Sequence, residues 1–182
     1  MTTQLQRKIR AALPDEGAVH ETLHGLSVEV WQEVVEALKL RLPEFDIVIG
    51  VGNGSLAFAT ALADLRAAAV TSARGTPTLA PHYRSDHWVV EQKPLLGRRT
   101  ALIATLEFAQ GHAELELSTL ARQAGLEVAG IAAGIEFTSK GGRSRVDMLG
   151  VKVFTLLQLA HTPSGLQSER RGEGGEILMP LT

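Results

Sequence analysis

Short apolar runs alternate with amphipathic segments along most of this chain. The runs are apolar at consecutive positions and rich in β-branched residues, which is typical of strands buried on both faces of a sheet. The segments between them carry apolar residues at helical spacing, most clearly in the stripe from Trp31 to Leu42. Strands that alternate with helices predict an α/β fold of three layers, with a mostly parallel central sheet flanked by helices. We expect about five central strands, at residues 47–51, 68–71, 101–104, 128–132 and 151–154.

Local signals indicate where several of the other elements begin and end. Ser27 is placed to N-cap the helix that carries the apolar stripe, and Pro43 to stop it. A polar helix is expected up to about residue 13, with residues 14–17 ending it. The polar segment 74–87 contains glycine and two prolines and predicts a long surface loop, after which "WVVE" is a candidate extra strand.

Composition bounds the class of protein. A chain of 182 residues with 45% hydrophobic and 21% charged residues is typical of one globular domain, residues 1–182. The net charge of −2 and pI of about 6.3 give no basic footprint for nucleic acid or a membrane surface. The absence of cysteine excludes disulfides, thiolate metal sites and a cysteine nucleophile. The apolar runs are shorter than the roughly 20 residues of a membrane span, and the start lacks the apolar core of a signal peptide, so we expect a cytoplasmic protein.

Two loops follow strands of the predicted sheet, at residues 52–55 and 107–113. Ligands of such sheets bind beyond the carboxyl ends of the strands, so a site is expected between these loops. Gly52 and Gly54 allow a sharp turn at a helix start that can attract an anion, although "GVGNGS" also suits an ordinary tight turn. Gly111 and His112 give the second loop similar donors, and an ordinary solvated loop is its alternative reading.

A methyltransferase or a dinucleotide-binding domain is another interpretation of "VIGVGNGSLA". Such sites need an acidic residue at the end of the next strand to hold ribose hydroxyls. The next strand ends in "AVTSARG", which has no Asp or Glu. The pattern therefore argues against both of these classes.

From about Ser27 to Leu159 the order of elements resembles the type I phosphoribosyltransferases, especially the orotate, adenine and xanthine branches. The resemblance rests on the glycine loop, the long polar loop, the second loop before a helix ending in "AG", then "EVAGIAAGIE" and "GGRSRVDMLGVKVFTLLQL". It implies a core of about residues 27–159 and a small hood from about residues 1–26 and 160–182. It also implies a homodimer and a phosphate-bearing or nucleotide ligand.

The family signature has four apolar residues, two acids, two apolar residues and then a loop that binds the 5′-phosphate. Counting back from Ala124-Gly125 by the family's usual helix length matches Ala113 to the last position of that loop. In this register the acidic pair falls on Thr105 and Leu106, and a shift by one residue restores no carboxylate. The matched phosphate- and nucleotide-binding residues are Thr105, Glu107, Phe108, Ala109, Gln110, Gly111, His112 and Ala113.

The resemblance implies further roles in transfer from phosphoribosyl pyrophosphate. The first loop would contact pyrophosphate, and the long loop would close over the site and supply cations, with His87 among them. Mg²⁺ is implied by the resemblance only, and the sequence predicts no metal-ligand cluster. The matched pyrophosphate residues are Val51, Gly52, Asn53, Gly54, Ser55 and Arg74, and the catalytic candidates are Glu107, His82, Tyr83 and Arg84.

The missing acids decide the functional hypothesis. In the family they hold the ribose hydroxyls and stabilise positive charge on the sugar, which Thr105 and Leu106 cannot do. Glu107 is expected to point to the other face, because adjacent strand residues alternate. We therefore expect a protein of nucleotide or nucleobase metabolism that binds phosphate or nucleotide and in which normal transfer is weak or lost. The alternatives are an active divergent transferase that uses Glu107, a methyltransferase and a structural role.

Overall fold

The computed structural model describes residues 3–75, 82–84, 87–171 and 177–178. Its helices are α1 (Gln4–Ala12), α2 (Glu16–His24), α3 (Val28–Leu38), α4 (Leu56–Arg66), α5 (His112–Gln123) and α6 (Gly142–Asp147). Its strands are β1 (Ile47–Val51), β2 (Ala69–Ala73), β3 (His82–Arg84), β4 (Val89–Glu91), β5 (Thr100–Phe108), β6 (Glu127–Phe137), β7 (Val153–Thr155), β8 (Gln158–Thr162), β9 (Gly165–Arg171) and β10 (Ile177–Leu178). Within these ranges, no helix is both long and apolar enough to span a membrane.

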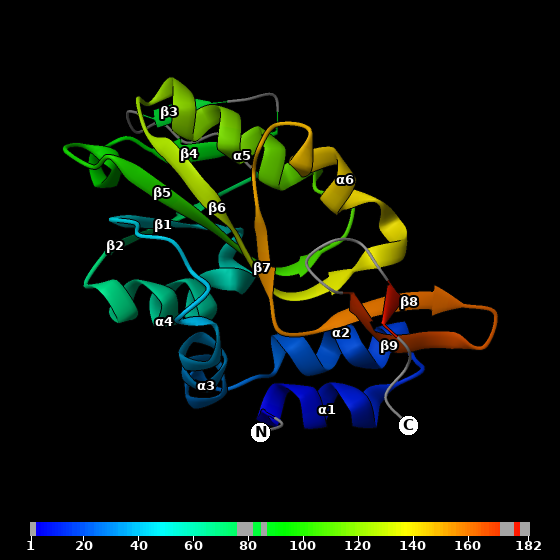
Figure 1. Cartoon of the computed structure of the whole chain (residues 1–182). Coiled ribbons are helices and arrows are strands. Elements are labelled where there is room, and N and C mark those ends of the chain that lie inside the picture. Colours follow the sequence, from blue (N-terminus) through cyan, green and yellow to red (C-terminus); the bar gives the residue numbers. More distant parts are fainter. Residues whose placement is uncertain (1–2, 76–81, 85–86, 172–176, 179–182) are drawn as a thin grey trace.

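The main sheet confirms the predicted architecture (Figure 1). Its strands follow the order β10-β9-β8-β6-β5-β1-β2, and β7 pairs with β6 as well. In this sheet the pairs β1–β2, β1–β5, β5–β6, β6–β7 and β6–β8 are parallel, whereas β8–β9 and β9–β10 are antiparallel. The five predicted strands correspond to β1, β2, β5, β6 and β7. β5 and β6 extend well past their predicted ends, because they remain paired as far as Phe108 and Glu136.

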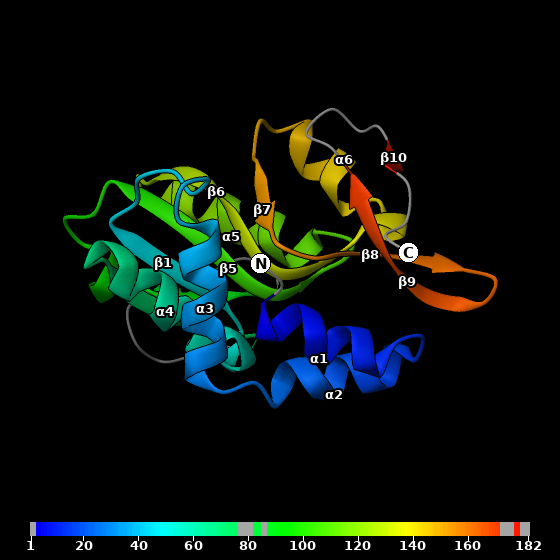
Figure 2. The same ribbon diagram turned by 60° about the horizontal axis from the view of Figure 1, so that its bottom comes forward.

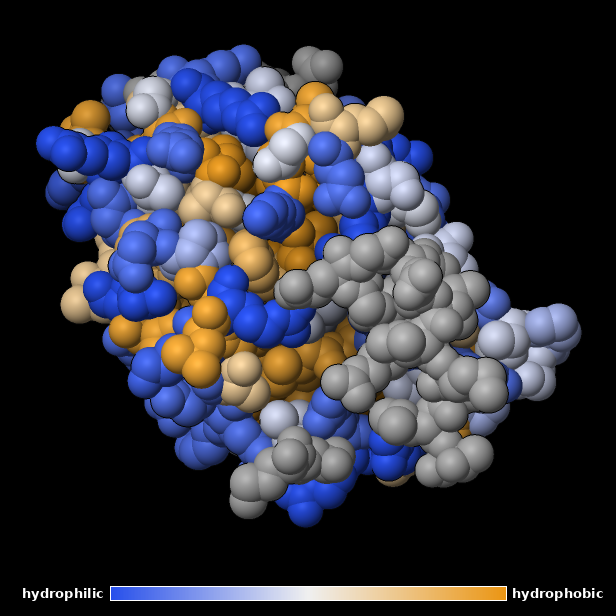
Figure 3. All heavy atoms as spheres, viewed as in Figure 1, coloured by the Kyte–Doolittle hydropathy of each residue, from blue (hydrophilic) through white to orange (hydrophobic). Residues whose placement is uncertain are grey.

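Two apolar layers cover the sheet, as strand alternation requires. Leu102 and Ala104 of β5 face one layer, which contains side chains of α1, α2, α3 and α4. Ala101 and Ile103 face the other layer, beneath α5. The face drawn in Figure 3 has polar margins, and apolar residues gather toward its middle.

Helices α1 and α2 pack against the β8–β9 hairpin, beside the carboxyl ends of β5 and β6 (Figure 2). Leu5, Ile9, Val19 and Leu23 of the N-terminal helices share an apolar cluster with the β8–β9 hairpin. The backbone N–H of Leu166 donates to the carbonyl of Pro14 at 3.0 Å. These contacts lie where a hood was expected, while the division into core and hood stays a prediction.

Smaller sequence expectations met mixed outcomes. "WVVE" does contain a strand, β4, which pairs antiparallel with β3. Ser27 stands at the N-cap of α3 but makes no capping hydrogen bond through its side chain. The N-terminal segment is a pair of helices, because Asp15 caps a second helix, α2, that we did not predict.

Candidate functional site

The second loop is shorter than its sequence suggested. β5 continues to Phe108, Ala109 and Gln110 form the turn, and α5 begins at His112. Gly111 has a φ of 75°, and a Cβ there would stand 3.3 Å from the Phe108 ring. Glycine is therefore favoured at this position by backbone conformation and by space.

Two hydrogen bonds hold α6 against this loop. The N–H of Gly142 donates to the carbonyl of Ala109 at 3.0 Å, and the Arg145 guanidinium donates to the carbonyl of Gln110. A Cβ on Gly142 would stand 2.2 Å from the Ala109 oxygen, so only glycine permits this approach. The carbonyls of the loop thus point toward α6, which leaves the hollow to the side chains and N–H groups at the start of α5.

A hollow of about 410 Å³ lies between this loop and α2. Most residues matched to the phosphate loop line it, but Phe108 does not, because its side chain is fully buried in the layer beneath α5. The lining residues are Glu16, Val51, Thr105, Glu107, Ala109, Gln110, Gly111, His112, Ala113, Glu114, Phe137 and Lys140.

The positions matched to the acidic pair face opposite sides of β5. Leu106 is 6% exposed and packs in the apolar layer of α3 and α4, whereas Thr105 lines the hollow. Glu107 lines the hollow too, so the expectation that it points away was wrong. Strict alternation does not continue past Leu106, because Phe108, which it would place beside Leu106, is buried beneath α5, and Glu107 instead meets His20 of α2. A carboxylate consequently reaches the hollow two positions along the strand from Thr105.

The side chain of Ser55 closes the first glycine loop through hydrogen bonds to the backbone of that loop. The buried Ser55 hydroxyl donates to the carbonyls of Val51 and Gly52, at 3.0 Å each. The N–H of Gly52, whose φ is 69°, donates to the carbonyl of Ala73 at 3.1 Å and is thus engaged within the fold. Asn53 is exposed and lines neither hollow described here.

A smaller hollow of about 200 Å³ adjoins this loop. It shares Val51, Thr105 and Glu107 with the larger one, so Glu107 stands at the boundary between the two. The remaining lining residues are His24, Gly54, Ser55 and Leu106.

The structure brings none of the described candidates of the long loop into the lining of the two hollows. His82, Tyr83 and Arg84 form β3, but their side chains lie outside the described part of the molecule. Arg74 is exposed, forms a backbone bridge with Val89, and lines neither hollow. His87 is exposed, and its Nδ1 lies 3.2 Å from Glu116 Oε1.

Carboxylates dominate the charge of the larger hollow. Burial raises the pKa of Glu114, and hydrogen bonds from its own backbone N–H and the Thr105 hydroxyl only partly oppose this. Glu107 Oε1 lies 2.7 Å from His20 Nδ1. Glu16 lies 3.0 Å from His161 and 3.8 Å from Lys140, and its pKa is lowered chiefly by the hydrogen bond with His161. Three carboxyl groups therefore line this hollow together with one ammonium group, that of Lys140.

The sequence missed several residues of this region, namely Glu16, His20, His24, Glu114 and Lys140. Three of them lie on α2, where Pro14 and Gly17 read as the end of a helix. The spacing of His20 and His24 would place both on one face once a helix capped by Asp15 is recognised. Glu114 and Lys140 carry no comparable sequence signal.

The residues present do not suit an Mg²⁺ site at the position of the acidic pair. Mg²⁺ prefers an octahedron of oxygen ligands, usually with carboxylates. Leu106 is buried in the apolar layer and Thr105 is neutral, so Glu107 is the one carboxylate that the end of β5 offers to this hollow. We therefore assign no chemical step to Mg²⁺.

Comparison with known proteins gives similarity in structure but not in sequence. No family model matches the sequence, and no curated protein is significantly similar to it. A phosphoribosyltransferase from Corynebacterium diphtheriae is 16% identical with a TM-score of 0.63, over 85% of this chain and 92% of that one. Adenine phosphoribosyltransferase from Thermoanaerobacter pseudethanolicus is 19% identical with a TM-score of 0.62, over 72% and 82%. Orotate phosphoribosyltransferase from Aeropyrum pernix is 18% identical with a TM-score of 0.54, over 80% and 74%.

These similarities extend over most of each chain and include the parallel sheet with its flanking helices. They lend no support to the methyltransferase alternative. Sheet order, layers and similarity to solved structures together show that the chain has a type I phosphoribosyltransferase-like fold.

Proposed function

We infer that this protein serves nucleotide or nucleobase metabolism by binding a ligand through a phosphate group, and that ordinary phosphoribosyl transfer is weak or lost. The observation that carries the proposal is the larger hollow at the N-terminus of α5, where Gln110 to Ala113 line the wall. Free N–H groups at the first turn of a helix attract anions. The ligand class is a nucleoside monophosphate or a ribose phosphate.

Weak transfer follows from the two matched acid positions. Thr105 offers a hydroxyl, and Leu106, which is 6% exposed, does not line the larger hollow. Each lost charge-assisted hydrogen bond costs on the order of 1.5–3 kcal/mol. Lost stabilisation of transition-state charge costs roughly a hundredfold or more in rate.

A second candidate function is an active but divergent phosphoribosyltransferase. Glu107 favours it, because its carboxylate lines both hollows beside Thr105 and is 27% exposed. For this role Glu107 would have to leave His20 and accept hydrogen bonds from the ribose hydroxyls. The long loop would supply cations, and a homodimer would be the expected assembly.

Binding is tested by calorimetric titration with ribose 5-phosphate and nucleoside monophosphates. The carboxyl groups that line the larger hollow weaken the binding of anions, so we expect dissociation constants in the millimolar range. Ala113→Asp places a carboxylate in the first turn of α5 and should abolish binding. Thr119→Asp adds the same charge at an exposed position of the same helix and should not. No saturable binding to the parent protein, or equal binding by both variants, would contradict the proposal.

Turnover separates the two candidate functions. The assay supplies phosphoribosyl pyrophosphate and Mg²⁺ with adenine, guanine, hypoxanthine, xanthine, uracil or orotate. We expect no turnover or very slow turnover with each base. Ordinary turnover with one base, lost in Glu107→Gln, would establish the divergent enzyme instead.

A further inference from the structure

Two histidines of α2 stand on one face of that helix. His20 and His24 are four residues apart, and their ring centroids lie 4.3 Å from each other. The preceding residues, Val19 and Leu23, bury a neighbouring face of the helix in the core, about 100° around its axis. Packing of α2 thus fixes the face from which the two imidazoles project.

A carboxylate from a distant part of the chain completes a cluster. Glu107 Oε1 lies 2.7 Å from His20 Nδ1, although 87 residues separate them in sequence. One potential ligand atom each of His20, His24 and Glu107 lies within 4.8 Å of the other two. In the described part of the chain, no other group of three such side chains approaches this closely.

The backbone makes room for the second imidazole. A Cβ on Gly54 would stand 2.9 Å from His24 Cε1 and 3.2 Å from its Nδ1. The absence of a side chain there lets His24 rest on the first glycine loop. Among the described residues its ring has no hydrogen-bond partner, so a nitrogen is available to a ligand.

We propose that His20, His24 and Glu107 form a binding site for a divalent transition-metal ion of the Zn²⁺ class. Two imidazole nitrogens and one carboxylate oxygen are a preferred donor set for such ions, whereas Mg²⁺ prefers oxygen alone. Ligand atoms around tetrahedral Zn²⁺ stand roughly 3.3 Å apart. The distances in the structure lie on either side of that value, since His20 Nδ1 and Glu107 Oε1 are 2.7 Å apart and all three ligand atoms lie within 4.8 Å of one another.

Three protein ligands leave one position of a tetrahedral ion open. His24 and Glu107 both line the smaller hollow, and Glu107 also lines the larger, so that position faces the candidate site. A cation there would offset part of the negative charge of Glu16, Glu107 and Glu114. An anionic oxygen ligand such as a phosphate is the chemistry that would complete the coordination, and this last step rests on the proposed function.

Metal binding is tested first, without nucleotide. The full chain is stripped with a chelator and titrated with Zn²⁺ in a calorimeter. We expect one equivalent at micromolar or tighter affinity, with no competition from millimolar Mg²⁺. His20→Ala and His24→Ala should each weaken binding by about tenfold or more. Both positions are exposed, and circular dichroism and the unfolding midpoint without metal confirm that the variants fold.

His161→Gln is the matched control. His161 also lies 3.0 Å from a carboxylate, that of Glu16 on the same helix, but it is not part of the cluster. This variant should bind Zn²⁺ as the parent does. Affinity unchanged in His24→Ala, affinity lost equally in His161→Gln, or no stoichiometric uptake by the parent would overturn the site.

Cobalt reports on the open position. Co²⁺ bound at this site should absorb visible light, and inorganic phosphate should shift its bands. A cobalt spectrum that phosphate leaves unchanged would refute phosphate as the fourth ligand while the metal site stands. Phosphate binding by a protein that takes up no metal would refute the metal site while the proposed phosphate site stands. Failure of the metal site and failure of the proposed function can thus be told apart.

Discussion

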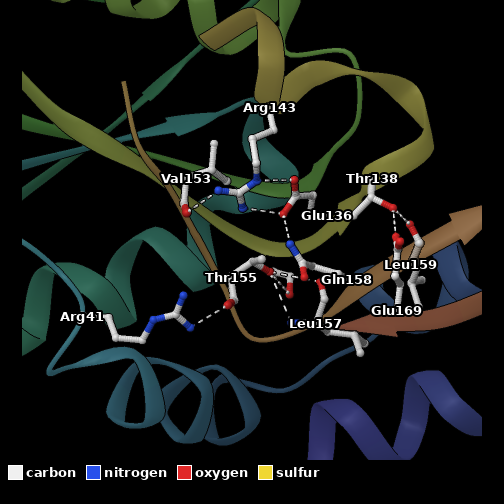
Figure 4. Close-up of polar contacts among 11 residues, drawn as sticks. Arg41, Glu136, Thr138, Arg143, Val153, Thr155, Leu157, Gln158, Leu159 and Glu169 are labelled. Atoms are coloured by element: carbon white, nitrogen blue, oxygen red, sulfur yellow. Dashed lines mark hydrogen bonds and ion pairs between the residues drawn. The ribbon is translucent and has the colours of Figure 1, made fainter. Parts of the chain in front are cut away.

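An ion pair between β6 and α6 holds α6 against the loop at residues 109–111, which is the candidate phosphate-binding loop. Arg143 donates from Nε to Glu136 Oε1 at 2.8 Å and from Nη2 to Oε2 at 2.6 Å (Figure 4). Gln158 donates to the same carboxylate at 2.9 Å. The side chain of Glu136 is 2% exposed and that of Arg143 is 36% exposed. We predict that Arg143→Met destabilises the protein and loosens the loop held by the adjacent Gly142.

The magnitude follows from what the substitution leaves behind. Removing one partner of a fully buried pair costs about 3–5 kcal/mol, because the other charge stays buried without compensation. Water reaches the guanidinium of Arg143, and Gln158 still serves Glu136, so we reduce the expected cost to roughly 2–3 kcal/mol. For a chain of this length that corresponds to a fall in Tm of roughly 4–12 °C.

Urea unfolding followed by circular dichroism measures this cost, and hydrogen exchange measures opening of residues 109–113. Glu136→Gln combined with Arg143→Met removes the stranded charge and keeps an acceptor for Gln158. The double variant should therefore be more stable than Arg143→Met alone. The reasoning is refuted if Arg143→Met unfolds at the parent's urea concentration, or if the double variant is the less stable of the two.

Four further substitutions test the site at single positions. Because burial raises the pKa of Glu114 above its ordinary value of 4.5, the folded state binds this proton more tightly than the unfolded state, and stability is lost as pH rises through the raised pKa. Glu114→Gln should accordingly raise Tm at pH 7, with an advantage that shrinks toward pH 4; a constant difference between the two proteins would count against this assignment. Gly111→Ala forces a left-handed backbone and crowds Phe108, so a loss of about 1–2 kcal/mol in urea unfolding is expected, and an unchanged midpoint would disprove the strain. Leu106→Asp places a charge among apolar side chains and should cost on the order of 3 kcal/mol or more, whereas Thr105→Asp is equally buried but borders the polar larger hollow and should cost less; equal stability of these two variants would contradict the orientation of β5.

The parallel sheet was predictable because β1, β5 and β6 are buried over most of their length and so show continuous apolar runs, whereas the edge strand β2 is only partly buried. The ends of β5 and β6 were not, since Glu107 and Glu136 interrupt those runs while the backbones remain paired. The β8–β9 hairpin was missed for a related reason. Its second strand is rich in charged and polar residues, and only its pairing with β8 makes it a strand.

The two loops of the site could be located from sequence, but the side chains that share the hollow could not. Loops at the carboxyl ends of parallel strands must meet at one edge, which needs only the order of elements. Contacts of α2 with this edge depend on tertiary packing of the N-terminal segment. No local signal relates His20 to Glu107, and burial of Glu114 beside Thr105 likewise appears only in three dimensions.

The position of Glu107, the one acid at the end of β5, explains how this site differs from the acidic pair of the phosphoribosyltransferase signature. The side chain at position 106 packs in the apolar layer, so Leu106 adds to the core. One position further, Glu107 points to the hollow and meets α2 through His20. The carboxylate that reaches the candidate ligand space is thus the same one that joins the terminal helices to the sheet. Any ligand or ion that recruits Glu107 must therefore also change the contact between α2 and β5, which couples occupancy of the hollow to the placement of the N-terminal helices.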